Sequence, residues 1–180
     1  MSEANPVLSP YPCQARETES LPVGAANRLH ANFVGSRYAA YQKRWEAARH
    51  KGFSWNWAAF FFGPGWLAYR KMHAGCAVFL VFVAFETALE QIASVPASIT
   101  AAIYLLVAMG FGASGDRLYK RHVDARVNKI TCDGHNPAAI DAELMRQGGT
   151  NMCSALYFVA TLVTMLVTIV VLLAEPPGLP

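Results

Sequence analysis

Charged residues are scarce in this sequence. Asp, Glu, Lys and Arg together make up 15% of its 180 residues, whereas an ordinary soluble domain carries about a quarter. Hydrophobic residues make up 54%, and they are concentrated in long runs. A helix that crosses a bilayer needs about 20 mostly apolar residues, which such runs supply. The composition therefore argues against an ordinary soluble domain and predicts a membrane protein.

Basic residues are absent from one end of the chain, and an apolar signal core is absent from the other. The last of the 15 Lys and Arg residues is Arg146, so the final 34 positions hold none. Residues 1–32 are polar and include four prolines, with no apolar stretch of the kind found in a signal peptide. We therefore expect residues 1–32 to form a mobile tail.

Catalytic and metal-binding patterns are also absent. The four cysteines are far apart in the sequence and predict no disulfide framework. The tightest metal-like group is Cys132-x-x-His135 with His122, and it lacks the fourth ligand of a structural zinc site. The remaining histidines have no neighbouring Ser, Cys or acid in a recognisable catalytic pattern. We therefore expect no catalytic residue, no metal and no cofactor.

Three runs are long and apolar enough to cross a bilayer. We place them at about residues 74–93, 97–114 and 153–174. At 1.5 Å per residue, each helix matches a hydrocarbon core of roughly 30 Å. A short uncharged turn at residues 94–96 joins the first two. The predicted fold is all-α: a polytopic membrane protein of three transmembrane helices, with amphipathic and interfacial helices on the cytoplasmic side.

The distribution of positive charge predicts the orientation. With three spans in residues 73–174, every Lys and Arg lies on one side, in residues 1–72 or in a helical loop at 116–150. The turn at 94–96 and a short outer tail at 175–180 lie on the other side. Because cytoplasmic loops are enriched in Lys and Arg, we expect a cytoplasmic N-terminus and a periplasmic C-terminus.

Residues 33–72 are expected to hold two surface elements, of which an amphipathic helix comes first. We place it at residues 36–51, with Ser36 as N-cap and Gly52 as the closing glycine. Tyr38, Tyr41 and Trp45 lie on one face, and basic residues surround it. Two interpretations are equally supported: the helix lies on the membrane surface, or it packs on the cytoplasmic loop of the protein itself.

The second element is an aromatic segment, residues 53–69, which is interrupted by Gly63-Pro64-Gly65. We expect a short interfacial helix, a turn, and a new helix starting near Pro64. Aromatic and basic side chains of this kind collect at the headgroup level, so we predict an interfacial anchor consisting of Trp55, Trp57, Trp66, Tyr69, Arg70 and Lys71. A fourth span is the alternative, and it conflicts with the charge rule.

The cytoplasmic loop is expected to contain two helical stretches. The second span should continue to Ile130, because residues 119, 123, 127 and 130 are apolar or aromatic and share one face. A separate helix should start at Pro137 after the cap Asn136 and end at Gly148. Ile140 and Leu144 of that helix should form a small apolar contact.

A long motif in this region resembles a known family. It reads Phe53-Ser54-Trp55-Asn56-Trp57-Ala58-Ala59-Phe60, then Gly63-Pro64, Trp66 and Tyr69-Arg70-Lys71-Met72. It is similar to the signature F-x-W-N-x-A-A-F…G-P-x-W-x-x-Y-R-K-M of small bacterial inner-membrane proteins that share a domain of unknown function. Matches at residues 33–35, 118–119 and 148–150 extend the resemblance over roughly residues 33–155. The resemblance implies a multi-span helical protein in a bacterial inner membrane, and it implies no reaction.

Two acids inside the first span are candidate functional residues. Glu86 and Glu90 are one helical turn apart, and an ionised acid at the centre of a span costs roughly 2.5–3.5 kcal/mol. We expect a protonated Glu86 that is hydrogen-bonded to a neighbouring helix. Its predicted partners form a polar stripe on the third span and are Thr161, Thr164 and Thr168. Proton or cation movement through the acid pair is the alternative.

The expected function is binding rather than catalysis. We expect a non-enzymatic inner-membrane protein that binds a partner protein in or at the membrane, in an accessory, regulatory or immunity role. Its partners would be the lipid bilayer and another membrane protein or itself, with no nucleic acid. Small residues that favour close helix approach support this interpretation, in the patterns Ala108-x-x-x-Gly112 and Gly110-x-x-x-Ser114.

Two further functions are weighed against partner binding. A small homo-oligomeric channel or transporter would use Glu86 and Glu90 to line a path. A lipid-acting enzyme with His122, Asp124 or His135 at the cytoplasmic face is the least favoured, because these residues share no known motif.

Overall fold

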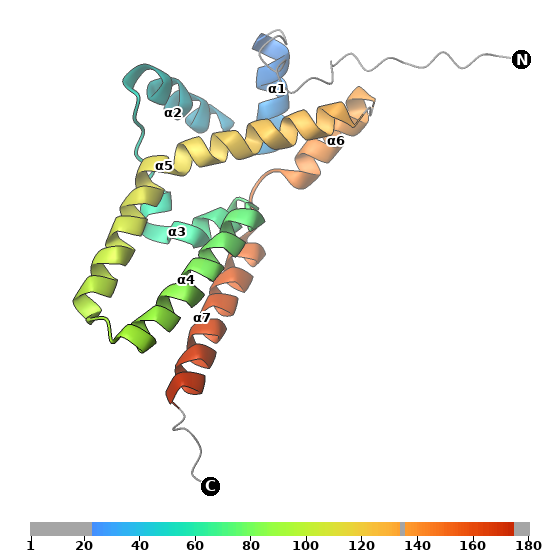
Figure 1. Cartoon of the computed structure of the whole chain (residues 1–180). Coiled ribbons are helices and arrows are strands. Elements are labelled where there is room, and N and C mark those ends of the chain that lie inside the picture. The colour runs from blue at the N-terminus through green and yellow to red at the C-terminus, as the bar shows by residue number, and fades with distance from the viewer. Residues whose placement is uncertain (1–22, 134–135, 175–180) are drawn as a thin grey trace, which may run out of the picture. The chain divides into compact units, whose positions relative to one another are not determined.

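The computed structural model describes residues 23–133 and 136–174, and within them the ordered elements are all helices (Figure 1). His135 and the expected outer tail at 175–180 lie outside the described residues, as do residues 1–22. The described residues form no strand and seven helices, which are α1 (Val23–Val34), α2 (Tyr38–Lys51), α3 (Trp57–Tyr69), α4 (His73–Ala93), α5 (Ala97–Cys132), α6 (Pro137–Gln147) and α7 (Met152–Ala174). The all-α prediction is confirmed.

The helices belong to two compact units. Among the described residues, the polar unit comprises residues 23–53 and 116–149 apart from 134 and 135, and the apolar unit comprises residues 54–115 and 150–174. Helix α5 gives its first half to the apolar unit and its second half to the polar unit. The division differs from the one expected, because residues 33–53 are grouped with the loop at 116–149 and not with residues 54–72.

Three helices, α4, α5 and α7, are long and apolar enough to cross a membrane. They begin within one residue of the stretches expected at 74–93, 97–114 and 153–174, so the predicted positions of the three long apolar helices are confirmed. Helix α3 has 13 residues, and at 1.5 Å per residue it is about 20 Å long. This is shorter than the roughly 20 residues that a spanning helix needs, so the length of α3 disfavours a fourth span at residues 53–69.

Helix α3 is capped at its start and broken in its middle. The side chain of Asn56 accepts a hydrogen bond from the backbone N–H of Ala59 at 3.0 Å, which is the usual N-cap arrangement. Gly63 has φ 45° and ψ −121°, a conformation that residues with a side chain rarely adopt, and Pro64 follows it. The break that the sequence predicted at residues 63–65 is therefore confirmed.

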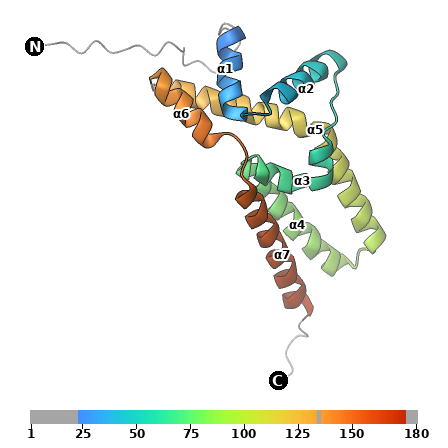
Figure 2. The same cartoon turned by 180° about the vertical axis from the view of Figure 1, so that it is seen from behind.

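Helix α3 packs against all three long helices of the apolar unit (Figures 1 and 2). Beside its start, the backbone N–H of Asn56 donates to the carbonyl of Gly112 on α5 at 2.8 Å. Beside its end, the carbonyl of Tyr69 accepts from the backbone N–H of Asn151, which immediately precedes α7, at 2.9 Å. Helix α3 therefore reaches from α5 to α7 within this unit.

Small residues permit this packing. A Cβ added at Gly115 would lie 2.7 Å from the Cβ of Ala59, and one added at Gly112 would lie 2.7 Å from the ring of Trp55. The pattern Ala108-x-x-x-Gly112 thus marks a close approach, as expected, but the partner is the segment before α3. Nothing lies within 4 Å of a Cβ added at Gly110.

The core of the polar unit is built on the second half of α5. Tyr119, Val123, Val127 and Ile130 are all at most 3% exposed, so their predicted common face is confirmed. Side chains of three other helices are buried in the same unit, namely Leu29 and Phe33 of α1, Tyr41 of α2, and Ile140 and Leu144 of α6.

Helix α2 packs on the protein's own loop helix. The rings of Tyr41 and Tyr119 have centroids 4.9 Å apart, and the rings of Trp45 and Tyr119 have centroids 6.2 Å apart. The indole N–H of Trp45 also donates to the carbonyl of Asp116 at 3.1 Å. Of the two interpretations of this helix, packing on the loop is the correct one, because its aromatic face is occupied by α5.

Two sequence predictions for the polar unit are wrong. Residues 23–32, which we expected to belong to a mobile tail, form most of α1 and bury Leu29 completely. Ser36 does not cap α2, which begins at Tyr38 after Arg37 and has no side-chain cap. The other helix ends are as predicted: Gly52 closes α2 with φ 69°, and Asn136 caps α6 by accepting from Ala139 at 2.8 Å.

Candidate functional site

The two acids of α4 are paired with hydroxyl groups of α5. Tyr104 donates a hydrogen bond to the carboxylate of Glu86 at 3.0 Å, and Thr100 donates to the carboxylate of Glu90 at 3.1 Å. Glu86 is 8% exposed. The four residues form two rungs, one helical turn apart, between antiparallel helices that are joined by the turn at 94–96. We call this arrangement the acid–hydroxyl ladder.

The predicted partners of Glu86 are therefore wrong. Thr161, Thr164 and Thr168 are exposed on α7, and Thr161 donates to the carbonyl of Tyr157 on its own helix at 2.8 Å. The sequence did contain a signal for the true pairing. Residues equally distant from Val95 face each other across a tight antiparallel hairpin, and 86 pairs with 104 as 90 pairs with 100.

The residues of the predicted interfacial anchor lie in different environments in the structure. Trp66 and Arg70 are buried, at 4% and 3% exposed, so they belong to the interior of the apolar unit. Trp55 packs on Gly112, and the Tyr69 carbonyl is bonded to Asn151.

Other side chains of the aromatic segment are exposed. Trp57, Phe61 and Phe62 on the first half of α3 are 62%, 70% and 72% exposed. The rings of Trp57 and Phe61 stack with centroids 5.8 Å apart. We call these three residues the aromatic face. The sequence prediction had identified Trp57 and had missed the two phenylalanines.

Two short segments that are far apart in the sequence, at residues 33–35 and 148–149, meet in the polar unit. The backbone N–H of Gly149 donates to the carbonyl of Phe33 at 2.7 Å. A Cβ added at Gly148 would lie 2.0 Å from the same carbonyl oxygen, so only glycine fits there. The contact joins the end of α1 to the end of α6.

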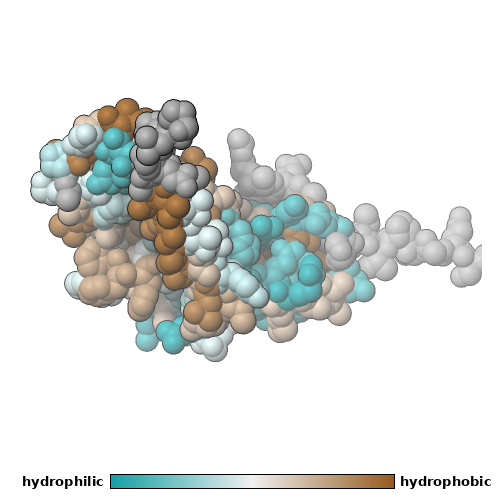
Figure 3. Space-filling view, turned by 90° about the horizontal axis from the view of Figure 1, so that it is seen from below, coloured by the Kyte–Doolittle hydropathy of each residue, from teal (hydrophilic) through white to brown (hydrophobic). Residues whose placement is uncertain are grey.

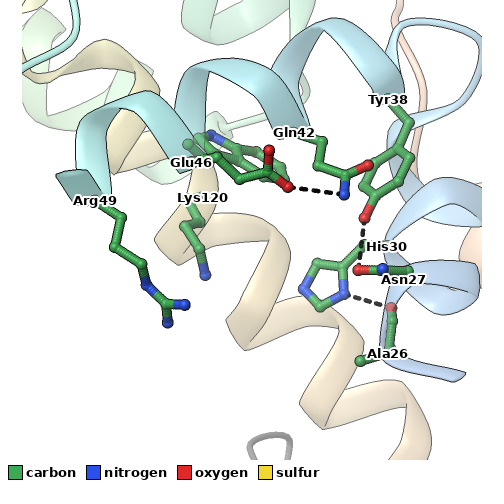
Figure 4. Close-up of a pocket in the computed structure, with 9 residues that line it drawn as sticks. Ala26, Asn27, His30, Tyr38, Gln42, Glu46, Arg49 and Lys120 are labelled. Carbon is green, nitrogen blue, oxygen red and sulfur yellow. Dashed lines mark hydrogen bonds between the residues drawn. The ribbon is translucent and has the colours of Figure 1, made fainter. Parts of the chain in front are cut away.

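A cavity of about 200 Å³ opens between α1, α2 and α5 in the polar unit (Figure 4). Its walls carry two basic side chains, one acidic side chain, an imidazole, a phenol and an indole. The lining residues are Ala26, Asn27, His30, Tyr38, Gln42, Trp45, Glu46, Arg49 and Lys120.

Most polar groups in this cavity are bonded to each other. The two ring nitrogens of His30 lie 2.7 Å from the Ala26 carbonyl oxygen and 2.8 Å from Asp124 Oδ1. Both of these oxygens are acceptors, so both bonds form together when the imidazole is doubly protonated. Lys120 donates to the same carboxylate at 2.7 Å. Burial tends to raise the pKa of Asp124, but the bonds from His30 and Lys120 outweigh it and hold that pKa below its ordinary value.

Three polar side chains of α2 that line the cavity are also hydrogen-bonded. Tyr38 donates to the side chain of Asn27 at 3.1 Å, and Gln42 donates to Glu46 at 3.0 Å (Figure 4). Burial and the nearby Glu46 charge raise the pKa of Tyr38, which disfavours its phenolate. The bonds in this cavity therefore hold α1 on α2 and α5. Sequence reasoning missed the cavity because His30 and Asp124 are 94 residues apart.

Metal ligands are not gathered in the described part of the chain, where no group of three or more His, Cys, Asp or Glu residues could hold an ion. His122 is instead packed against Phe33, with ring centroids 6.0 Å apart. His135, the other histidine of the metal-like group in the sequence, lies outside the described residues.

Comparison with known proteins places the chain in a family. The family described as "Protein of unknown function (DUF2628)" matches residues 25–124, which include α2 to α4 and most of α1 and α5. No curated protein and no solved structure matches the chain. The matched region covers more than half of the 180 residues and holds the aromatic motif and the acid–hydroxyl ladder, and the chain therefore belongs to this family of unknown function.

Proposed function

We propose that this chain is a non-enzymatic, multi-pass protein of a bacterial inner membrane that binds another membrane protein or a second copy of itself. An accessory, regulatory or immunity role fits such a protein. Its cytoplasmic side would carry the N-terminus and the polar unit, and its C-terminus would be periplasmic. The proposal is supported by the resemblance of the aromatic motif to small inner-membrane proteins and by the exposed surfaces of the long helices.

The sparse packing of the three long helices carries the proposal. Among the described side chains of α7, Phe158 is the buried one, while Leu156, Val163 and Val167 are 64%, 54% and 57% exposed. On α4, Val81 and Phe85 are 70% and 68% exposed. On the face seen from below in Figure 3, many apolar side chains (brown) lie at the surface. These surfaces are covered by lipid or by other apolar helices, and the exposed sides of the three long helices leave room for both.

The charge distribution supports the orientation. The described residues of the polar unit contain 12 Lys and Arg against 6 Asp and Glu, a difference of +6. The described residues of the apolar unit contain Arg70, Lys71, Glu86 and Glu90, which sum to zero. A polar unit with this excess of basic residues is retained on the cytoplasmic side.

The acid–hydroxyl ladder supports a structural role for the two glutamates. Each carboxylate has a hydroxyl partner on the next helix of the same hairpin, so neither needs a ligand to satisfy it. A channel or transporter is the second candidate function, and the observation that favours it is the buried position of an acid, Glu86, within a candidate span. Ion flux through liposomes should then be lost in Glu86→Gln and Glu90→Gln.

Photo-crosslinking in intact membranes tests partner binding. A photo-reactive residue would replace Val163 or Val81, which are exposed, with Ile140 as the control because it is buried in the polar unit. We expect discrete adducts from the exposed positions only. An adduct that is heavier by 19.6 kDa would identify a second copy. Diffuse lipid labelling without any discrete protein adduct, at every exposed position of α4 and α7, would contradict the proposal.

A further inference from the structure

Helix α3 contacts the three long helices at one end only. On α4 its partners are Gly75 and Cys76 in the first turn: Leu67 Cδ1 lies 3.1 Å from a Cβ built on Gly75, and the Cys76 thiol lies 3.8 Å from the Pro64 carbonyl. On α5 its partners lie at residues 111–115, and beside α7 its partner is Asn151. All of these positions are at the end opposite to the turn at 94–96.

The two ends of the apolar unit therefore differ in width. Near residues 94–96, α4 and α5 are joined by a turn and bridged by the acid–hydroxyl ladder. At the other end, α3 lies across the unit and reaches from Gly112 on α5 to Asn151 before α7 (Figures 1 and 2). A helix of 13 residues is about 20 Å long and about 10 Å wide, so α3 adds roughly 200 Å² to the cross-section of this end alone.

The outward side of α3 is suited to lipid. Trp57, Phe61 and Phe62 are more than 60% exposed, and residues 56–69 contain no charge. A basic residue that is only partly buried, Lys71, follows this helix and is suited to the headgroup level. A helix too short to span, apolar outward and buried inward, inserts into one leaflet only.

We infer that α3 is a one-leaflet wedge: it widens the apolar unit in the leaflet opposite to the turn at 94–96, and the aromatic face takes the lipid chains of that leaflet. The inference rests on the proposed membrane insertion. Its consequence is a preference for membranes in which that leaflet is convex, because convex leaflets have looser headgroup packing and accommodate extra apolar bulk. The protein is then a sensor of membrane curvature as well as a partner-binding protein.

The test uses the full chain, fluorescently labelled and reconstituted into vesicles of phosphatidylcholine and phosphatidylglycerol of small and large diameter. Protease digestion of the exposed polar unit separates molecules whose α3 end faces outward from those whose α3 end faces inward. For outward molecules we expect about a twofold or greater rise in density per lipid on small vesicles, which a preference of about 0.4 kcal/mol produces. Inward molecules should show the opposite trend. This comparison needs no variant.

A pair of matched variants locates the effect on the aromatic face. The combined change Trp57→Ala, Phe61→Ala and Phe62→Ala should reduce the density ratio toward one. The control replaces three exposed residues of α5, Ile99→Ala, Leu105→Ala and Leu106→Ala, and should leave the ratio unchanged.

Three results would overturn the inference. The first is equal density on small and large vesicles, or equal trends for the two orientations, in protein that resists extraction by alkaline carbonate. The second is an unchanged ratio in the aromatic-face variant. The third is a dimer in detergent that becomes monomeric in that variant, because the face would then cover a second copy. Release of the unchanged protein by carbonate would refute membrane insertion itself, and the wedge with it.

Discussion

The Tyr104 hydroxyl on α5 lies 3.0 Å from the Glu86 carboxylate on α4 and donates a hydrogen bond to it. The neighbouring pair, Thr100 and Glu90, repeats this contact one turn closer to the connecting turn. Two polar rungs with the same spacing fix how far one helix can slide along the other. In an apolar surrounding, a shift by one turn would leave a carboxyl group without its partner, which is costly.

The first prediction is that Glu86 stabilises the hairpin through this bond. Tyr104→Phe should lower the stability of the apolar unit by about 0.6 kcal/mol and at most roughly 1.7, the range found for hydrogen bonds between membrane helices. Glu86→Gln should have a smaller effect, because its amide oxygen still accepts from the Tyr104 hydroxyl. Thermal unfolding in a mild detergent measures both changes.

A double-mutant cycle separates this bond from general packing. Once Tyr104 is Phe, Glu86→Leu should cost less than it does in the unchanged chain, because the bond is already missing. Fully additive losses would show that the two side chains do not act as a pair. A Glu86→Gln variant that melts normally but loses ion flux would favour a channel function over partner binding.

The sequence was informative where the cause of a structure is local. The helix caps at Asn56 and Asn136, the break at Gly63 and the buried stripe of α5 all follow from residues within one or two turns of each other. Long-range pairing was harder to predict. His30 contacts Asp124 across 94 residues, and no spacing rule links them. The threonine stripe of α7 misled the partner assignment for Glu86, because composition identifies polar residues in a span but not the direction that each one faces.

Helix α1 was missed for a related reason. Its residues, Val23–Val34, follow a polar segment rich in proline and carry no cap signal, so composition favoured a tail. The helix is held by tertiary contacts instead. Leu29 is completely buried, and the Phe33 carbonyl accepts from Gly149. Most helical stability in proteins comes from such packing and not from intrinsic propensity. A single sequence does not reveal this packing.

The second prediction concerns glycines of α5 that differ only in their surroundings. Gly112→Ala and Gly115→Ala should each destabilise the apolar unit by about 1–3 kcal/mol, because the new Cβ meets Trp55 or Ala59 at 2.7 Å. Gly110→Ala is the control, since nothing lies within 4 Å of its added Cβ. It should be neutral or slightly stabilising, as Ala has the higher helix propensity. Equal melting temperatures for all three variants would mean that α3 does not pack on α5 as described.

The third prediction concerns topology. A reporter that is active only outside the cytoplasm should work when fused after Ala174 or inserted at residues 94–96, and it should fail at His135. The physical reason is the retention of the basic segments on the cytoplasmic side, since the described polar unit carries an excess of six positive charges. A second reporter that is active only in the cytoplasm provides the reciprocal control. Periplasmic activity at His135 would rule out the three-span arrangement.

The fourth prediction concerns acid sensitivity of the polar unit. His30 and Lys120 both donate to Asp124, and they hold its pKa below the ordinary value. A depressed pKa means that folding favours the ionised carboxylate. The stability it contributes is therefore fully present above the unfolded pKa of about 3.9, and it is lost as the pH falls through that value toward the folded pKa.

Asp124→Asn removes this contribution at every pH. At neutral pH it should lower the stability of the polar unit by on the order of 1 kcal/mol, because the charged bonds are lost and Asp124 is partly screened by solvent. Between pH 7 and about 3, its stability should fall less than that of the unchanged chain. Other ion pairs, such as Arg44 with Asp116 at 3.9 Å, titrate in both proteins, so the difference between them isolates Asp124. Hydrogen exchange of the α1 amides measures this difference in stability, because His30 joins α1 to α5. Parallel pH profiles for the two proteins would show that this ion pair does not hold α1 in place.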